Sequence, residues 1–401
     1  MLYEWHWTTY LLYVAFAFGT VICIRRLKRT SGCIQEYRSQ VVISQERLII
    51  FFIFFATLMI LPMFRNLDLY PSYDYSVATG VRTIDPQAYV WQFLSGQNPG
   101  FNIKSMLTLS QTEPLLYSLA AFILSFGGGI QTVWFVVYGI VVLCYWIFFR
   151  NTVEPEFNYA LFLPFFAHYL YSMSAIRSGL SFAFFYAAVG YLKKDRKLIA
   201  IIMLALGFSS HYLILFGILG LVFDYFIRKS SNKKQMVLLL FAICVVATVL
   251  FEVHAANIIA ATKYRTYLEG GRMTVIGQIP VLVLFVLILF NYNKLKIQYA
   301  DRMIFVNLSV FSAMMCPFVI IFGAYRVESY FLLARLYTWG MLLKLLAESK
   351  TIPGSSVRVR IFGRSIHAFD AIGGMGAFIW MTKQIYDMRG IGLMPLFSSF
   401  I

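Results

Sequence analysis

Charged side chains are scarce in this chain of 401 residues, and acidic ones are the scarcest. Only 13% of the residues are charged, and the 18 Asp and Glu stand against 34 Lys and Arg. The sequence has no Walker-type phosphate loop, no accessible DxD-like carboxylate pair and no GxSxG elbow. These absences argue against ATP-driven transport and against metal-assisted glycosyl transfer from a nucleotide sugar.

Cysteine is also rare and follows no metal-binding spacing. Four of the five cysteines stand in apolar stretches: Cys23, Cys144, Cys244 and Cys316, with Cys33 the exception. We therefore expect neither a disulfide framework nor a zinc site, and no cofactor or metal. The opening segment MLYEWHWTTY lacks the basic start of a cleaved signal peptide. Its first apolar run is expected to be retained as a membrane span.

Apolar residues dominate what remains. They make up 60% of the chain, and the mean hydropathy is +0.72, which is typical of a protein whose solvent is the bilayer. The pattern predicts an all-α polytopic protein with a single transmembrane domain over residues 1–401 and about 12 spans of roughly 20 residues each. The apolar runs fall at 8–24, 48–64, 130–149, 157–174, 177–192, 198–210, 212–227, 236–251, 274–292, 303–323, 327–347 and 366–381.

Basic clusters set the predicted orientation of these spans. They follow the first, fifth, seventh, ninth and eleventh runs, and positive residues beside spans tend to stay in the cytoplasm. Both termini are therefore expected outside. The count requires the long apolar stretch 198–227 to be a hairpin with its turn at GFSSHY, 207–212, because one helix of that length would be about 45 Å long, against a hydrocarbon core of about 30 Å.

Two longer connections are expected on the outer side. Residues 65–129 form an aromatic loop that ends in a short apolar stretch, 113–126, whose length suits an interfacial helix better than a span. Residues 252–273 form the second external loop.

Four ionisable residues lie within or beside the predicted spans, at or near their outer ends: Arg177, His211, Arg326 and Arg335. Such groups are costly in a membrane unless they face a polar cavity or a partner, so each is a functional hypothesis. Arg177 has no acidic residue within a turn on either side, which favours phosphate binding, with snorkelling to headgroups as the alternative. His211 is a candidate proton acceptor or a hydrogen-bonded structural residue at a turn.

Arg326 and Arg335 are nine residues apart, which places them on opposite sides of one ideal helix. Arg326 is a candidate ligand for the substrate, with Tyr325 beside it. Arg335 is either a substrate-binding residue or the ion-pair partner of Glu328, seven residues earlier on the same face.

The predicted external segments add further candidates. Glu113 stands at the start of the short apolar helix, where it is either a helix cap or a second candidate base. Tyr264, Arg265 and Tyr267 form a basic and aromatic cluster that suits sugar stacking and phosphate binding. The same residue types are common at any membrane interface.

Three segments together resemble a known family. They are EPLLY after the aromatic loop, AIRSGLSFAFFYAAVGYLKKDRK, and SSHYLILF, and they are similar to the EpsG branch of the Wzy-type polysaccharide polymerases, which include O-antigen polymerases. Members typically carry Arg-Gln-x-x-Ala at the position of Arg177, Phe-His-x-Ser at that of His211, and a late Arg with a nearby Tyr. This chain has Ser178 in place of Gln and Ser181 in place of Ala.

The resemblance implies a membrane fold like that of the C-type glycosyltransferases and a site that faces the periplasm or exterior from the bacterial inner membrane. Undecaprenyl-diphosphate-linked oligosaccharides would be both donor and acceptor in a metal-independent, inverting transfer, with a chain-length regulator as a further partner and no nucleic acid. Arg177 and Arg326 would stabilise the departing diphosphate, and His211 or Glu113 would take the acceptor proton. A flippase for lipid-linked glycans and an O-antigen ligase are the alternatives.

Overall fold

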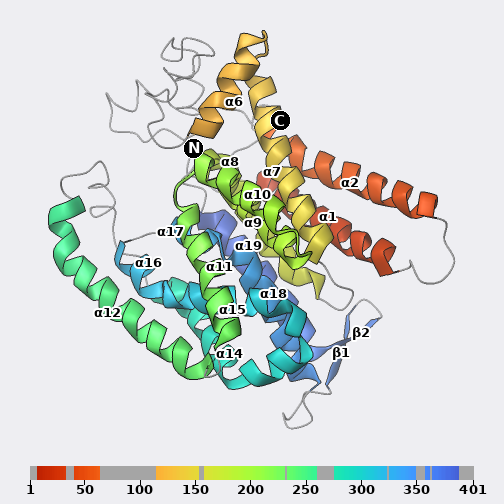
Figure 1. Ribbon diagram of the computed structural model, residues 1–401. Coiled ribbons are helices and arrows are strands. Elements are labelled where there is room, and N and C mark those ends of the chain that lie inside the picture. Colours follow the sequence, from red (N-terminus) through yellow and green to blue (C-terminus); the bar gives the residue numbers. More distant parts are fainter. Residues whose placement is uncertain are drawn as a thin grey trace. The chain divides into compact units, whose positions relative to one another are not determined.

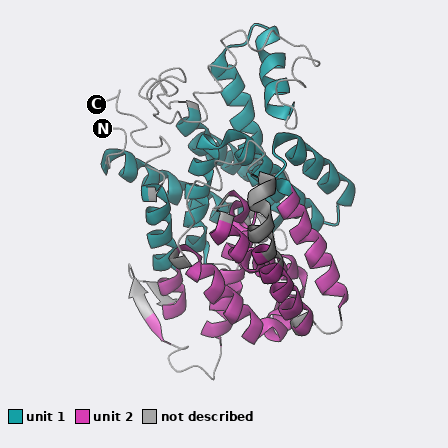
Figure 2. Cartoon of the chain, turned by 90° about the vertical axis from the view of Figure 1, so that its left-hand side faces the viewer, with its two compact units in different colours: residues 1–214, 374–401 teal, residues 215–373 magenta. Residues whose placement is uncertain are grey.

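The computed structural model describes residues 7–32, 40–63, 114–152, 158–230, 233–259, 275–322, 325–348, 357–361 and 364–387. Helices account for nearly all of these residues (Figure 1). They divide into two compact units, residues 1–214 with 374–401, and residues 215–373 (Figure 2). We call them unit 1 and unit 2. The all-α fold predicted from the sequence is confirmed in part, since helices dominate the described residues beside one two-stranded sheet.

Unit 1 is built around a helix that is apolar on every side. Its helices are α1 (Trp7–Gly32), α2 (Gln40–Met63), α6 (Pro114–Ser125), α7 (Ile130–Thr152), η2 (Tyr159–Phe162), α8 (Leu163–Ser174), α9 (Ile176–Lys193), α10 (Lys197–Ser210) and the end of α19 (Ala368–Asp387). Helix α9 packs against α7, α8 and α10 and is buried along almost its whole length. A helix with that composition is stable only inside a bundle.

Aromatic rings fill the space between α7, α8 and α9. The Tyr145 hydroxyl lies 3.0 Å from His168 Nε2, and the rings of Tyr145 and Phe165 meet edge to face at 4.8 Å between centroids. His168 is therefore a buried residue within this aromatic core. Edge-to-face contacts of this kind add stability beyond the area that they bury.

Unit 2 contains shorter and more often interrupted helices. They are α11 (Ile214–Lys229), α12 (Lys233–Ile259), η3 (Val275–Gln278), α14 (Ile279–Gln298), η4 (Ala300–Arg302), α15 (Met303–Met314), α16 (Cys316–Phe322), α17 (Tyr325–Ser329), α18 (Leu332–Ala347) and the start of α19. Helices α14, α15 and α18 pack on one another. Phe305 of α15 stacks on Tyr337 of α18 at 4.4 Å between ring centroids.

Four of the described helices are long and apolar enough to cross a bilayer, judged by length and composition. Their spans are Trp7–Leu27, Gln45–Pro62, Ile130–Thr152 and Ile279–Gln298. The predicted count of about 12 is not confirmed. Helices such as α8 and α15 have 12 residues and extend only about 18 Å, so each is too short to cross the hydrocarbon core by itself.

The structure differs from the sequence expectation at several boundaries. Strands β1 (Arg358–Ile361) and β2 (Arg364–His367) pair antiparallel in a stretch where only a connection was expected. Alternating Val and Arg in VRVRI is the two-residue period of a strand. Helix α12 continues to Ile259, eight residues into the predicted loop 252–273, because EVHAANII contains no Gly or Pro to end it.

Candidate functional site

Arg177 stands at a break between two helices of unit 1. Helix α8 ends at Ser174, Ala175 leaves the helical conformation with φ −100° and ψ 66°, and Arg177 is the second residue of α9. Its side chain is half-buried. The first N–H groups of a helix have no acceptor within the helix and favour a negative charge, so Arg177 adds a cation where the backbone already attracts an anion.

A glycine allows the close approach of the chain at this break. A Cβ on Gly179 would lie 2.5 Å from Ser172 Cβ and 2.7 Å from the Ser172 carbonyl oxygen. Those distances are shorter than van der Waals contact, and one of the atoms belongs to the backbone, which cannot rotate away. Gly179 therefore fixes how α8 meets the first turn of α9, where Arg177 stands.

His211 ends helix α10 in an extended conformation, with φ −161° and ψ 123°. The side chain is buried, and its Nδ1 accepts a hydrogen bond of 3.2 Å from the Leu213 amide. Helix α11 starts at Ile214. The predicted hairpin turn at 207–212 thus coincides with a break between helices at 211–213, which the imidazole itself stabilises, while the hairpin stays a prediction.

That hydrogen bond decides which nitrogen of the neutral ring carries the proton. Because His211 Nδ1 accepts from the Leu213 N–H, the neutral imidazole holds its hydrogen on Nε2 and acts there as a donor. Action as a base through Nε2 would first require the proton to move to Nδ1 and the Leu213 bond to break. The geometry thus favours donation by His211 over proton abstraction.

Helix α9 connects the two candidate residues of unit 1. The Ser181 hydroxyl, fully buried, donates to the His211 carbonyl oxygen at 3.3 Å. Ser181 follows Arg177 by four residues, about one turn, so both project from one face of α9. The face of α9 that carries Arg177 is therefore the face that meets the end of α10.

Arg335 lies at the centre of a polar cluster in unit 2. Its side chain is 4% exposed, and its Nη1 lies 3.6 Å from Glu328 Oε2 and donates to Ser312 Oγ at 3.4 Å. Its Nη2 donates to the Glu328 carbonyl oxygen at 3.5 Å. The predicted ion pair of Arg335 with Glu328 is confirmed, while substrate binding by Arg335 stays a prediction.

Arg326 belongs to the one-turn helix α17, and it is half-buried. Turn residues Tyr330 and Phe331 separate α17 from α18. The expectation that Arg326 and Arg335 take opposite sides of one continuous helix is therefore wrong, because the helix is interrupted between them. Tyr325 begins α17, and its side chain lies outside the described residues.

Other candidates cannot be placed. Glu113, Tyr264, Arg265 and Tyr267 lie outside the described residues, as do residues 65–113 of the predicted external loop. The short apolar helix predicted at 113–126 is present as α6, of 12 residues.

Within the described ranges, no three His, Cys, Asp or Glu side chains lie close enough together to form a metal site.

A second buried polar network in unit 2 was missed at the level of sequence. Arg228 donates twice to Asp224, at 2.9 and 2.6 Å, Asn307 donates to the same carboxylate at 2.8 Å, and the Tyr292 hydroxyl donates to Asn307 at 3.0 Å. The network ties α11 to α14 and α15. The four-residue spacing of Asp224 and Arg228 was its only sequence signal.

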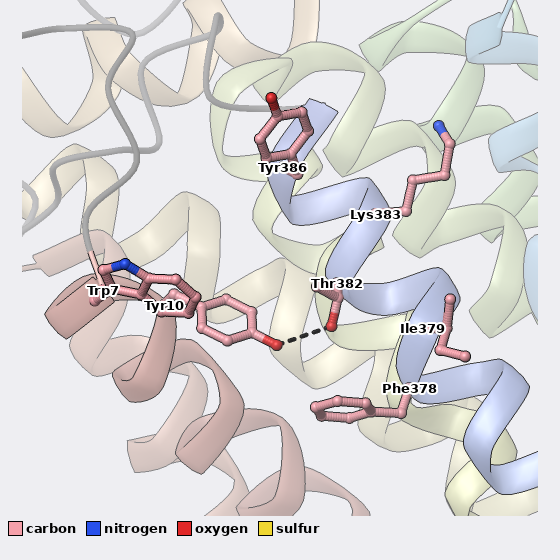
Figure 3. Close-up of a pocket in the computed structure, with 7 residues that line it drawn as sticks. All are labelled: Trp7, Tyr10, Phe378, Ile379, Thr382, Lys383 and Tyr386. Carbon is pink, nitrogen blue, oxygen red and sulfur yellow. Dashed lines mark hydrogen bonds between the residues drawn. The ribbon is translucent and has the colours of Figure 1, made fainter.

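An apolar pocket of about 560 Å³ lies in unit 1, apart from the predicted candidates (Figure 3). Helices α1 and α19 line it through Trp7, Tyr10, Phe378, Ile379, Thr382, Lys383 and Tyr386. Tyr10 and Thr382 join their hydroxyls at 2.9 Å across it. None of these side chains is a sequence-predicted site residue.

Apolar helices with ionisable side chains at their breaks define the chain as a membrane protein. The EpsG family model matches residues 75–353, which is more than half of the sequence. The chain therefore belongs to the EpsG family, whose members are Wzy-type polymerases. No curated protein and no solved structure matches the chain. The predicted likeness to C-type glycosyltransferases stays a prediction.

Proposed function

We propose that this protein polymerises undecaprenyl-diphosphate-linked oligosaccharide repeat units into O-antigen or exopolysaccharide. The observation that carries the proposal is the match to the EpsG family, which spans both the Arg177 and His211 segment of unit 1 and the Arg326 and Arg335 segment of unit 2. The reaction would be an inverting glycosyl transfer without metal, on the periplasmic face of the bacterial inner membrane.

The chemistry of the transfer suits the residues at the helix breaks. When the bond between the anomeric carbon and the phosphate oxygen breaks, the diphosphate leaves with the electron pair and gains negative charge. Arg177, in the first turn of α9, would stabilise that charge, and so would Arg326 on α17. A donor on His211 Nε2 suits the same anion.

Reconstitution tests this function directly. Purified protein in lipid nanodiscs, given synthetic lipid-linked repeat units and a chelator, should extend the chains, and Arg177→Ala should not. Arg150→Ala, which alters an exposed arginine at the end of α7, is the matched control and should retain extension. Absence of extension by the wild-type protein would contradict the proposal.

A flippase is the second candidate, because both units contain interrupted helices, at Ala175, His211, Met315 and Tyr330. Transporters use such breaks to bind substrates within the membrane. In proteoliposomes, a flippase would move the lipid-linked unit across the bilayer without lengthening it. A ligase would transfer the glycan only when a lipid-core acceptor is supplied.

A further inference from the structure

One oxygen of the Glu328 carboxylate lacks a hydrogen bond. Oε2 lies 3.6 Å from Arg335 Nη1, whereas Oε1 is buried and has no hydrogen-bond partner among the residues that the structure describes. The whole side chain is 19% exposed. A buried acceptor without a hydrogen bond costs free energy unless a ligand or water donates to it, so Glu328 Oε1 calls for a functional explanation.

The surroundings hold this carboxylate in place. Arg335 is itself fixed by hydrogen bonds to Ser312 Oγ on α15 and to the Glu328 carbonyl oxygen. A base that is held by a fixed partner loses little freedom when it meets its substrate. The Arg335 contact therefore orients one oxygen and leaves the other to accept a proton.

Interrupted helices flank the same cluster. Helix α15 ends at Met314, within a turn of Ser312, and α17 ends at Ser329, next to Glu328. Within a membrane, non-helical backbone is tolerated where it is buried in protein or lines a water-filled cavity. A break of this kind is compatible with a polar substrate beside the carboxylate. Arg326, which we assign to the diphosphate, stands two residues earlier in α17.

We infer that Glu328 is the general base of the transfer, an inference that rests on the proposed polymerase function. The hydroxyl oxygen of the acceptor sugar attacks the anomeric carbon of the donor and forms the new carbon–oxygen bond. The bond from that carbon to the phosphate oxygen breaks, and the diphosphate leaves with the electron pair. The hydroxyl proton passes to Glu328 Oε1. Inversion at the anomeric carbon follows from this single displacement.

His211 is less well suited than Glu328 to act as the general base. Its Nδ1 already accepts the Leu213 amide, so the neutral ring offers a donor on Nε2. Glu328 is a carboxylate with one oxygen held by a cation and one without a hydrogen bond among the described residues. The assignment therefore gives the acceptor proton to Glu328.

Glu328→Gln is the first test, because the amide oxygen can still accept from Arg335 but the side chain cannot take a proton. We expect turnover in the nanodisc assay to fall about 100-fold or more, with the KM for the donor little changed and the acid limb of the pH profile lost. Glu348→Gln is the matched control, since Glu348 is half exposed at the end of α18 and bonds Gln298 and Lys344. Its turnover should match that of the wild type.

Azide separates a base from a structural residue. Azide is already an anion, so it can attack the anomeric carbon without a base, and Glu328→Ala with azide should release an inverted glycosyl azide. Chain extension by the wild-type protein tests the polymerase function separately, because its absence would contradict the proposed function and not the role of Glu328 alone. Full turnover by Glu328→Gln, an unchanged acid limb in its residual activity, or a folded Glu328→Ala that yields no glycosyl azide would each overturn the inference.

Discussion

The two units hold their candidate residues in different ways. In unit 1, His211 is fixed by the backbone amide of Leu213 and by the Ser181 hydroxyl, and Arg177 stands at the start of a long helix. In unit 2, Arg335 contacts the Glu328 carboxylate and donates a hydrogen bond to Ser312. Unit 1 thus presents donors and positive charge, which suit a leaving anion. Unit 2 presents a cation-held carboxylate, which suits a proton acceptor.

The largest effect is expected at Arg177. Arg177→Ala removes the cation at the start of α9, and we expect polymer formation to fall about 100-fold or more, as for loss of one preorganised transition-state donor. Arg177→Lys keeps the charge without the bidentate fork and should recover only part of the activity. Polymer ladders from a deletion strain, with expression levels matched, measure both. Full-length ladders from Arg177→Ala would contradict the role of Arg177 in stabilising the leaving diphosphate.

A smaller but still large effect is expected at Gly179. Gly179→Ala places a methyl group 2.5 Å from Ser172 Cβ, so α8 and the first turn of α9 must separate. A displacement of about 1 Å at a reacting group can cost about 100-fold in rate, and we expect a loss between tenfold and that value. Gly376→Ala is the control, because no atom lies within 4 Å of its Cβ position. Equal turnover of the two variants would contradict the steric role of Gly179.

The role of His211 can be separated by two variants. In His211→Asn, the amide oxygen can replace Nδ1 as the acceptor for the Leu213 N–H, but the short side chain has no donor at the position of Nε2. The longer side chain of His211→Gln can place its NH2 donor at that position. If His211 donates, the Gln variant should keep about tenfold more activity than the Asn variant, a difference of one charge-assisted hydrogen bond. If His211 is a base, both variants should lose activity equally. Initial rates of chain extension decide between the two roles.

The Asp224 network should affect stability and not chemistry. Asp224→Asn removes the charge that Arg228 and Asn307 both contact, which we expect to cost about 1.5–3 kcal/mol of unfolding free energy. Asp195→Asn is the control, because its ion pair with Lys197 is exposed and Asn tolerates the positive φ of 55° there. Thermal unfolding in detergent should show a lower Tm for Asp224→Asn alone. Loss of turnover at a temperature where Asp224→Asn is folded would contradict a purely structural role and would show that the Asp224 network contributes to catalysis.

Local signals in the sequence predicted a good part of this arrangement. The break at His211 followed from a run too long for one span, and the Glu328 and Arg335 pair followed from their seven-residue spacing. Each of these two predictions depends only on residues that are close together in the sequence. The contact of Asn307 with Asp224 joins residues 83 positions apart, and no local pattern contains it. The breaks at Met315 and Tyr330 also escaped prediction, although Pro317 follows the first and the polar pair Glu328 and Ser329 precedes the second.

The role of Arg177 can be measured apart from chain growth through a product mimic. A short-chain prenyl diphosphate should inhibit the wild-type polymerase by occupying the site of the leaving group. The account predicts that Arg177→Lys, which keeps residual activity, raises the inhibition constant about tenfold, since it loses one charge-assisted hydrogen bond. Glu328→Gln should leave that constant unchanged. An equal inhibition constant in the wild type and in Arg177→Lys would contradict the assignment of the diphosphate to Arg177.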